Sequence, residues 1–344
     1  MRLDRVTSAR LAALSFLLGA GLVLAAEPKE WLERMNKALT TRNYVGVFTH
    51  VRGDRAETLR IIHRVKGSNV SERLLSLDGS EREFIREGDE LTCYFPDRRE
   101  VLVERGAPDS PLLALPSLDE GDSTVYEIQG GDRQRLSGRN TRVVALTPRD
   151  EYRYGYRLWI DEESSMPLKT QLCDQSGKVI EQILFSNIDL PERIPDSMFK
   201  PSVDASNYRW LRAERQLASN ALPTPWEAMR LPPGFRMQIR GAQSMPGSNE
   251  PVAHLVFTDG VASVSVFVEP RKADAPAPGP ARVGSSSAFS TVVDGHQVTA
   301  VGEVPPNTVQ FIATQVKSTL STSKTATAPA TQGLGLTPAP PRRK

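Results

Sequence analysis

The sequence predicts an α+β protein that is rich in β-structure, with a large curved antiparallel sheet followed by a smaller α+β domain. Short segments of alternating apolar and polar residues follow one another from residue 44 to residue 188, separated by turn residues and by no long helix. This spacing is typical of an antiparallel meander. A hairpin pattern recurs around Asp259-Gly260, because glycine tolerates the positive φ of a tight turn. Helical spacing is found chiefly at Pro28–Leu39 and Thr308–Leu320.

Length and charge restrict the class of protein. The 344 residues favour two domains, and a hydrophobic content of 39% with 26 prolines and 24 glycines indicates that part of the chain lies outside a packed core. The formal net charge is only +2, and the many arginines are interleaved with acidic residues. This pattern is typical of solvated sheet faces and gives no indication of nucleic-acid binding.

The first 26 residues have the pattern of a cleavable export signal peptide. Three arginines precede an apolar run at Leu11–Ala25, and Ala25-Ala26 offers a cleavage site. The run is short for a membrane span of about 20 residues, although an uncleaved signal anchor is the alternative. The segment has no adjacent arginine pair for twin-arginine export and no cysteine for lipid attachment. We therefore expect export by the Sec route as a soluble protein.

The N-terminal domain is expected to span residues 27–203. Pro28 suits the first turn of a helix, along which Trp31, Met35 and Leu39 recur at four-residue spacing. Strands are expected at 44–51, 58–65, 70–77, 82–86, 90–95, 101–104, 124–128, 142–146, 154–160, 168–173 and 179–188. A sheet of so many strands must curl or close to hide its apolar face, so we expect helices against its concave side.

Two other segments link these parts. Leu112, Leu113 and Leu115 lie between prolines, interrupt the meander, and predict a short helix or lid. Residues 204–228 are expected to connect the two domains, with a helix over Tyr208–Ala218.

The second domain is expected to span residues 229–320, and residues 321–344 to be a disordered tail rich in Thr, Ala, Pro and Gly. The expected elements of this domain are a strand at 235–240, the hairpin around Asp259-Gly260, a flexible loop at 271–284, a hairpin around Asp294-Gly295 and the helix Thr308–Leu320. In the second strand of the first hairpin, Ala262, Val264, Val266 and Val268 alternate with Val261, Ser263, Ser265, Phe267 and Glu269. This alternation predicts one buried and one solvated face.

The sequence lacks the usual catalytic and cofactor-binding arrangements. It contains no nucleophile elbow, phosphate-binding glycine loop, metalloprotease helix motif or paired-cysteine motif. His50 and His63 lie on neighbouring predicted strands, but two histidines are too few for a structural zinc site. We therefore expect no enzyme activity, no cofactor and no metal. Export permits a disulfide between Cys93 and Cys173, and two separate buried thiols are an equal alternative.

Large apolar residues are concentrated in the predicted strands of the N-terminal domain. Two interpretations stay open: a packed core, or a concave apolar slot for an acyl chain, open at one end. The residues expected to line such a slot are Phe48, Leu59, Ile61, Phe84, Tyr94, Tyr126, Trp159, Leu172 and Phe185.

Four segments are distinctive enough to indicate a family. They are Asn43–Gly53 (NYVGVFTHVRG), Ser76–Asp97 (SLDGSEREFIREGDELTCYFPD), Tyr156–Asp161 (YRLWID) and His254–Pro270 (HLVFTDGVASVSVFVEP). In this order they resemble the periplasmic sigma-E regulators called RseB or MucB, and most of all the MucB branch of pseudomonads. The likeness continues across both domains.

The resemblance implies a fold and a function. The N-terminal domain is expected to be similar to the lipoprotein carriers LolA and LolB, with a half-open curved sheet and helices in its mouth. The C-terminal domain is implied to bind the periplasmic part of a membrane anti-sigma factor of the MucA or RseA kind and to shield it from regulated proteolysis. Lipopolysaccharide or another acyl lipid is implied as the releasing effector, and in the MucB branch alginate production is held down. A homodimer is left open.

Within this hypothesis, Phe257, Val266 and Phe267 are the candidate partner-binding residues, although a place in the domain core is an equal alternative for Val266. The main alternative function is a periplasmic lipid or lipoprotein carrier, because a curved sheet with a lid would serve it. A simple carrier would not need the second domain. An envelope hydrolase is disfavoured because catalytic motifs are absent.

Overall fold

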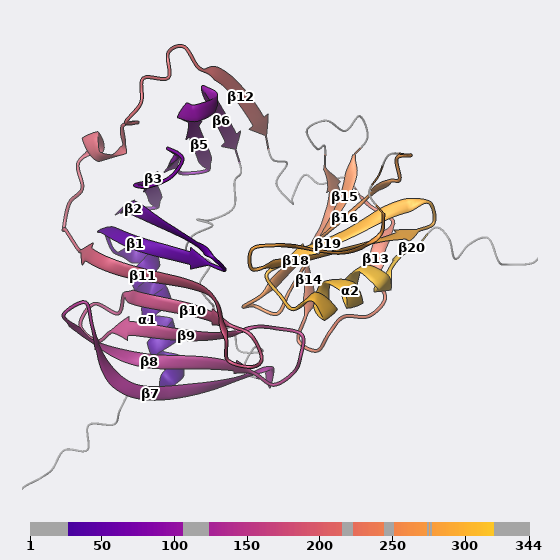
Figure 1. Ribbon diagram of the computed structural model, residues 1–344, viewed down its shortest axis with the longest axis horizontal. Helices are drawn as coiled ribbons and strands as arrows, with labels where there is room; N and C mark the ends of the chain where they lie inside the picture. Colours follow the sequence, from indigo (N-terminus) through magenta and orange to yellow (C-terminus); the bar gives the residue numbers. More distant parts are fainter. Residues whose placement is uncertain are drawn as a thin grey trace, which may run out of the picture.

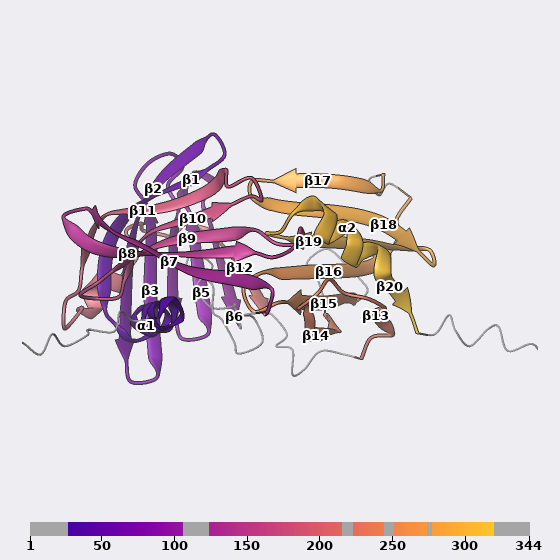
Figure 2. The same cartoon turned by 90° about the horizontal axis from the view of Figure 1, so that it is seen from below.

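The computed structural model describes residues 27–105, 124–214, 223–243, 251–273, 275 and 277–319. Within these residues the chain forms two domains that lie side by side in both ribbon views (Figures 1 and 2). The first is a twelve-stranded sheet with helix α1 (Pro28–Thr41) in its hollow, and the second is a six-stranded sheet with helix α2 (Pro306–Gln315) against it. The expected α+β class, with a large curved sheet and a smaller C-terminal domain, is confirmed.

The strands of the first domain follow the predicted alternation closely. They are β1 (Tyr44–Arg52), β2 (Arg55–Lys66), β3 (Asn69–Ser76), β4 (Glu83–Glu87), β5 (Glu90–Phe95), β6 (Glu100–Arg105), β7 (Tyr126–Leu136), β8 (Arg139–Pro148), β9 (Gly155–Asp161), β10 (Pro167–Cys173), β11 (Val179–Asp189) and β12 (Arg209–Glu214). The described residues of this domain also form the short 3-10 turns η1 (Pro96–Arg98) and η3 (Asp196–Phe199).

Two antiparallel meanders make up the large sheet. Strands β1 to β6 follow one another in space, as do β7 to β11, and the two series join where β1 pairs with β11. At this junction Phe48 of β1 lies opposite Phe185 of β11 and Leu59 of β2. Strands β7 and β12 form the two edges, so the described part of the sheet is half-open and not a closed barrel.

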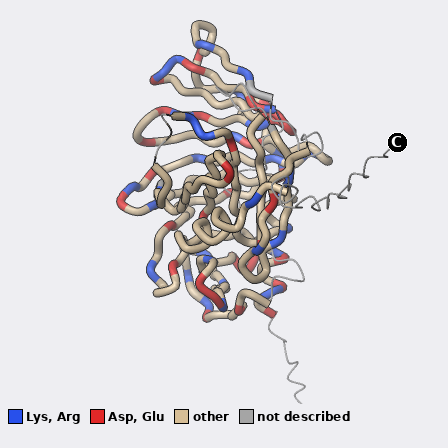
Figure 3. The backbone as a smooth tube through the Cα atoms, turned by 90° about the vertical axis from the view of Figure 1, so that its right-hand side faces the viewer, with Lys and Arg blue, Asp and Glu red and all other residues tan. Residues whose placement is uncertain are grey.

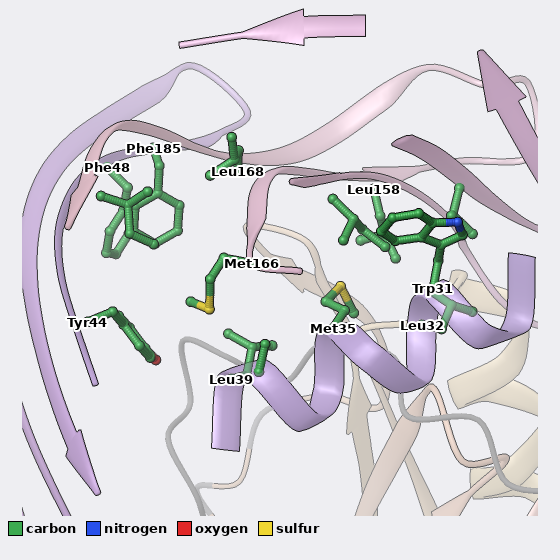
Figure 4. Close-up of a cluster of buried hydrophobic side chains, with 14 of the residues drawn as sticks. Trp31, Leu32, Met35, Leu39, Tyr44, Phe48, Leu158, Met166, Leu168 and Phe185 are labelled. Atoms are coloured by element: carbon green, nitrogen blue, oxygen red, sulfur yellow. The ribbon is translucent and has the colours of Figure 1, made fainter. Parts of the chain in front are cut away.

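Helix α1 forms because its apolar residues share one side and Pro28 occupies the first turn, where a backbone N–H is not needed. Its buried face lies against β7 and β8. Figure 4 shows Trp31, Leu32, Met35 and Leu39 of the helix facing side chains of the sheet, with Met166 between the helix and the Phe48–Phe185 pair. The predicted helix over residues 28–39 is confirmed, and this cluster is the core of the domain.

The convex face of the sheet is covered by the chain itself. After β11, residues 190–208 (the crossing segment) pass over this face and lead into β12. Phe199 packs on Ile62, and Glu83, only 1% exposed, accepts hydrogen bonds from the backbone N–H and the hydroxyl of Ser202. These contacts hold the crossing segment to the strands of the first meander.

The helix predicted over Tyr208–Ala218 is wrong for its described part, and residues 215–218 lie outside the described residues. Residues Arg209–Glu214 form β12, which pairs in parallel with β6. The ring of Trp210 lies edge-on to Tyr94, with 6.3 Å between ring centroids. Hydrogen bonds to the sheet edge and this aromatic contact override the helical spacing, so the segment leading to the second domain is itself an edge strand.

The second domain is an antiparallel sheet with one face covered by α2. Its strands are β14 (Arg236–Gln243), β15 (Val252–Thr258), β16 (Ser263–Pro270), β17 (Gly279–Val283), β18 (Ser286–Val293) and β19 (His296–Gly302), and a separate pair is formed by β13 (Trp226–Ala228) and β20 (Val316–Ser318). Both predicted hairpins are present. The helix predicted to reach Leu320 ends at Gln315, because the next residues pair with β13. Part of the loop predicted at 271–284 is the edge strand β17.

Three expectations concern residues outside the described part of the chain: the signal peptide, the lid at Leu112–Leu115 and the tail after residue 320. Among the described residues, no helix is long and apolar enough to cross a membrane. Figure 3 shows Lys and Arg interspersed with Asp and Glu over the described chain, which is consistent with solvated sheet faces.

Candidate functional site

The concave face of the large sheet has a filled half and a hollow half. Helix α1 fills the half formed by β7 to β11, whereas the strands of the first meander bound a cavity of about 290 Å³. The apolar side chains that line it come from β2, β3, β4 and β5 and are Leu59, Ile61, Leu74, Phe84 and Leu91. A cavity with such a floor would accept an alkyl chain, because burying apolar surface there removes it from water.

Charged residues surround this apolar floor, and each arginine of the cavity is paired with a glutamate. Arg52 Nε lies 2.9 Å from Glu181 Oε2, Arg86 Nε lies 3.6 Å from Glu72 Oε2, and Arg82 pairs with Glu57. The cavity therefore combines apolar walls with cations that could meet an anionic headgroup.

The polar end of the cavity continues into a wider groove of about 1050 Å³. His50, Arg52, Glu57 and Arg82 line both. Along β1 the change is gradual, because Phe48, His50 and Arg52 are alternate residues and point to the same face. An amphiphile could lie along this face with its chain inward and its headgroup in the groove.

A second polar group lies deeper in the same face. His63 Nδ1 is 2.8 Å from Glu72 Oε1, and the His63 ring stacks on Tyr44 with 4.6 Å between centroids. Burial, and next the charge of Glu72, raise the pKa of Tyr44 well above its usual value. His50 and His63, although on adjacent strands, do not meet: His50 lies opposite Glu57, and His63 opposite Tyr44.

The nine residues predicted to line a lipid slot divide into several groups. Leu59, Ile61 and Phe84 line the cavity. Phe48, Tyr126 and Phe185 do not line the cavity and lie in the packed core around α1, to which Leu59 and Ile61 also belong. Leu172 is 4% exposed and lies opposite Tyr156 on β9, outside the cavity lining.

The prediction was wrong for Tyr94 and Trp159. Tyr94 lies on the convex face, in a cluster with Val101 under the crossing segment. Trp159 points away from the core that holds its neighbours Leu158 and Ile160, donates a hydrogen bond from Nε1 to a glutamine side chain, and packs under Lys169. The face away from the cavity is also covered at these two positions, so an apolar residue there can be buried without facing the cavity.

Cys93 and Cys173 are both buried and both free. They lie on β5 and β10, with β4, β3, β2, β1 and β11 between these strands in the sheet. A disulfide needs Cα atoms within about 7 Å, so this structure contradicts the bridge and supports two separate buried thiols.

The tip of the Asp259-Gly260 hairpin is where the second domain docks on the first. Asp259 Oδ2 accepts hydrogen bonds from Arg153 Nη1 at 2.6 Å and from the Tyr126 hydroxyl at 3.3 Å. Asp259 Oδ1 accepts the backbone N–H groups of the turn, which fixes the carboxylate. Val261 at the tip packs against the core of the first domain. The hairpin therefore has a structural role that its alternation alone did not indicate.

Helix α2 makes further contacts with the first domain. The hydroxyl of Thr308 donates to the carbonyl of Tyr152 at 2.8 Å, and Asn307 donates to the carbonyl of Glu151 at 3.1 Å. The rings of Tyr152 and Phe311 lie edge to face with centroids 5.6 Å apart. The start of the helix and the hairpin tip thus hold the same loop between β8 and β9.

A pair of carboxyl groups forms a second point of contact between the domains. Glu181 on β11 receives His50 Nε2 at 2.8 Å and the Arg52 guanidinium, while Ser285 of the second domain is hydrogen-bonded to Glu303. Burial raises the pKa of Glu181, but hydrogen bonds from His50 and Arg52 outweigh this effect and lower it to about 2. Burial, and next the charge of Glu181, raise the pKa of Glu303. The two carboxyls therefore interact across the contact.

The candidate partner-binding residues lie on opposite faces of the second sheet. Phe257 and Val266 are fully buried in the domain core, so their assignment to a partner surface is wrong in this conformation. Phe267 lies on the other face, where its ring stacks on His254 at 4.7 Å between centroids. The face opposite α2 is formed by Val256, Ser265, Phe267, Thr299 and Val301 (the open face).

Sequence reasoning missed Arg153, Asp259, Glu181 and Glu303, because each has its partner far away in the sequence. The described residues contain no group of three or more His, Cys, Asp or Glu side chains that could hold a metal ion.

This geometry defines a two-domain, β-rich binding protein whose first domain has an apolar cavity with a charged rim. The chain belongs to the MucB/RseB family: the model of the MucB/RseB N-terminal domain matches residues 27–203, and that of the C-terminal domain matches residues 220–317. The resemblance seen in the four sequence segments is therefore confirmed.

Relatives from several bacteria are similar along most of the chain. The sigma factor AlgU regulatory protein MucB of Pseudomonas aeruginosa is 28% identical over 92% of this chain and 99% of its own length. The sigma-E factor regulatory protein RseB of Escherichia coli is 29% identical over 83% of this chain and 89% of its own. Identity to these two relatives does not separate the MucB branch from the RseB branch.

Solved structures of MucB are similar to the whole fold. The complex of Pseudomonas aeruginosa MucA and MucB is matched at 27% identity with a TM-score of 0.66, over 85% of this chain and 99% of that one. A crystal structure of MucB without a named partner is matched at 26% identity with a TM-score of 0.61, over 86% and 99% of the two chains. The relatives are regulators of sigma factors, and one of them is solved with MucA.

Proposed function

We propose that this protein is a regulator that binds the periplasmic region of an anti-sigma factor, protects it from regulated proteolysis, and is released by an acyl lipid such as lipopolysaccharide. Family membership supports the regulatory role, and the complex of MucB with MucA supports an anti-sigma partner. The observation that supports release by an acyl lipid is the cavity, whose apolar floor and arginine rim fit an anionic amphiphile.

The open face of the second domain is the surface proposed for the anti-sigma factor. Its central residue, Phe267, is partly exposed and held in place by its stack on His254. Aromatic residues of this kind contribute strongly to protein interfaces because they bury large areas with little loss of side-chain freedom. A partner segment lying across β16 and β19 would cover this ring.

The effector site is proposed to be the cavity, and a single substitution tests it. Leu91 lines the cavity and is partly exposed, so Leu91→Glu places a charge among the acyl-binding side chains without opening the packed core. We expect this variant to lose at least about tenfold in affinity for lipopolysaccharide, because a methylene-rich chain cannot pair with a carboxylate. Fluorescence titration with a labelled lipopolysaccharide measures the change.

A matched control places the same charge elsewhere in the first domain. Leu77 is 49% exposed and is not among the residues that line the cavity. Leu77→Glu should bind the lipid as the native protein does. Equal binding by Leu91→Glu and Leu77→Glu would remove the cavity from the proposal.

Export to the periplasm belongs to the same proposal. Residues 1–26 have the pattern of a Sec signal peptide. Mass spectrometry of protein recovered from a periplasmic fraction should give a mature chain that starts at Glu27. A chain that retains residues 1–26 would favour a membrane anchor.

A lipid or lipoprotein carrier is the second candidate, because the apolar cavity would also serve transport. The two functions differ in what the second domain does. A carrier would transfer a labelled lipoprotein between membranes with residues 229–320 playing no part, whereas a regulator needs this domain to hold its partner. Transfer of a lipoprotein without any binding of an anti-sigma segment would favour the carrier.

A further inference from the structure

Arg52 lies at the place where the cavity meets the domain contact. Its side chain lines the cavity, the polar groove beside it, and a third groove of about 1220 Å³ that both domains line. Its aliphatic part lies against Gly284 of the second domain so closely that a Cβ there would overlap Arg52 Cδ. Gly284 also has a φ of +62°, which favours glycine for a second reason. One residue thus contacts both the proposed ligand space and the other domain.

The charge of Arg52 compensates a carboxylate that faces the second domain. Arg52 Nε and Nη2 lie 2.9 and 3.2 Å from the two oxygens of Glu181. Ser285, 1% exposed, lies within hydrogen-bonding reach of Glu181 and is bonded to Glu303. The titratable groups that face this contact are His50 and Arg52 from β1, Tyr156 from β9, Glu181 from β11 and Glu303, the residue that follows β19.

Two acidic groups can share a partly buried site only when nearby cations or protons offset their repulsion. Arg52 is the cationic group hydrogen-bonded to Glu181 in the described structure, and His50 Nε2 lies 2.8 Å from the same carboxylate. Arg52 is 41% exposed at its side chain, so it can turn toward another anion without breaking the core. When Arg52 turns away, Glu181 loses its cationic partner, whereas the carboxyl group of Glu303 stays beside Glu181.

We propose that Arg52 couples the cavity to the docking of the second domain: an anionic group of an amphiphile in the cavity draws Arg52 away from Glu181, and the exposed repulsion between Glu181 and Glu303 then loosens the contact between the domains. The ligand class is an alkyl chain carrying a phosphate or a similar anion. The inference rests on the proposed function for the ligand, and it adds the route by which that ligand changes the second domain.

Substitutions in the ligand-free protein test the coupling by themselves. Arg52→Gln removes the cation and should raise amide hydrogen exchange at residues 285–287 and 259–262 by at least about tenfold, because exchange reports local opening. Adding Glu303→Gln to that variant should restore slow exchange, since the neutral amide can still accept the Ser285 hydrogen bond. Arg55→Gln is the matched control: Arg55 lies opposite Arg52 on β2 and lines the same grooves, but no ion pair joins it to Glu181.

Three small-molecule probes then separate the effect of the ligand's alkyl chain from the effect of its negative charge. Decyl phosphate should raise exchange at the same amides in the native protein, whereas decyl maltoside, which has the same chain without the charge, and inorganic phosphate, which has the charge without the chain, should leave it within about twofold. The single variant Glu303→Gln, whose substituted residue lies outside the cavity, should still bind decyl phosphate but show no rise in exchange.

The outcomes distinguish this inference from the proposed function. Binding of decyl phosphate without a rise in exchange, or an equal rise in Glu303→Gln, overturns the coupling while leaving lipid binding intact. Failure of every probe to bind overturns the lipid effector, and the ligand-free variants still decide the coupling. Unchanged exchange in Arg52→Gln overturns the coupling, and so does a rise in exchange that is not reversed when Glu303→Gln is added to that variant.

Discussion

Arg153 and Asp259 are 106 residues apart in the sequence, yet Arg153 Nη1 and Asp259 Oδ2 lie 2.6 Å apart with both side chains fully buried. The same guanidinium donates hydrogen bonds to the Asp150 carboxylate and to the carbonyl of Pro233. Its central carbon, Cζ, lies over the rings of Tyr126 and Phe235. An unpaired charge at such a buried position would be very unfavourable, so the contacts of Arg153 with these partners form together when the domains dock.

Removing one member of this pair should destabilise the docked protein strongly. Breaking a buried ion pair costs about 3 to 5 kcal/mol because the remaining charge stays buried without a partner. We expect Arg153→Met to lower the free energy of unfolding in urea by that amount. Arg133→Gln is the control, because Arg133 pairs with Glu162 at 2.7 Å while its side chain is 70% exposed, and such pairs contribute about 0 to 1 kcal/mol. Equal effects of the two substitutions would contradict the role assigned to Arg153.

The Asp259-Gly260 hairpin shows which features the sequence could predict and which it could not. Alternation correctly separated the buried Val264 and Val268 from the outward Phe267, because period two depends only on local geometry. Nothing local connects Asp259 with Arg153, so a residue chosen for its turn propensity had a second role in docking. The prediction that Trp159 lines the cavity was wrong for a related reason. A strand pattern tells which residues share a face, but not what covers that face.

Segment 208–218 shows the same limit for secondary structure. Its apolar spacing was compatible with a helix, and only the free edge of β6 made a strand the better solution for Arg209–Glu214. Leu59 and Ile61 line the cavity because that face of the sheet is concave and only partly filled by α1; that a lipid binds there stays a prediction.

The domain contact should weaken as the pH rises. Burial, and next the charge of Glu181, raise the pKa of Glu303 when the domains are docked; in an undocked, exposed state it would return to about 4.5. A raised pKa means that docking is fully supported by this group below about pH 4.5 and loses that support as the pH rises through the docked pKa. Hydrogen exchange at residues 285–287 should therefore quicken with pH beyond its intrinsic dependence. The variant Glu303→Gln should remove the excess, and an unchanged excess would assign it to another group.

Both cysteines should be free and slow to react in the native protein. Burial, and next the charge of Glu104, raise the pKa of Cys93 to about 11, and burial raises that of Cys173. Only about one Cys93 in a thousand would be a thiolate near pH 8. Iodoacetamide should leave the folded protein unmodified, and denaturant without reductant should expose two reactive thiols. Absence of reactive thiols after denaturation would show a disulfide.

The substitution Phe267→Glu should weaken binding of an anti-sigma segment by at least about tenfold, because it replaces a partly exposed aromatic ring on the open face with a charge. The first domain should keep its stability, which urea unfolding followed by tryptophan fluorescence can show. Met229→Glu supplies the comparison, since Met229 is 58% exposed in the same domain and β16 does not contain it. A loss of affinity shared by both variants would remove the open face from consideration.

The most direct measurement is calorimetric titration of the mature protein, residues 27–344, with the periplasmic segment of the anti-sigma factor from the same organism, repeated after saturation with lipopolysaccharide. The proposed function predicts saturable binding without lipid and an affinity at least about tenfold lower with it, a coupling of about 1.4 kcal/mol. No binding by folded protein would contradict the regulatory role. Binding that lipid leaves unchanged would contradict the release mechanism.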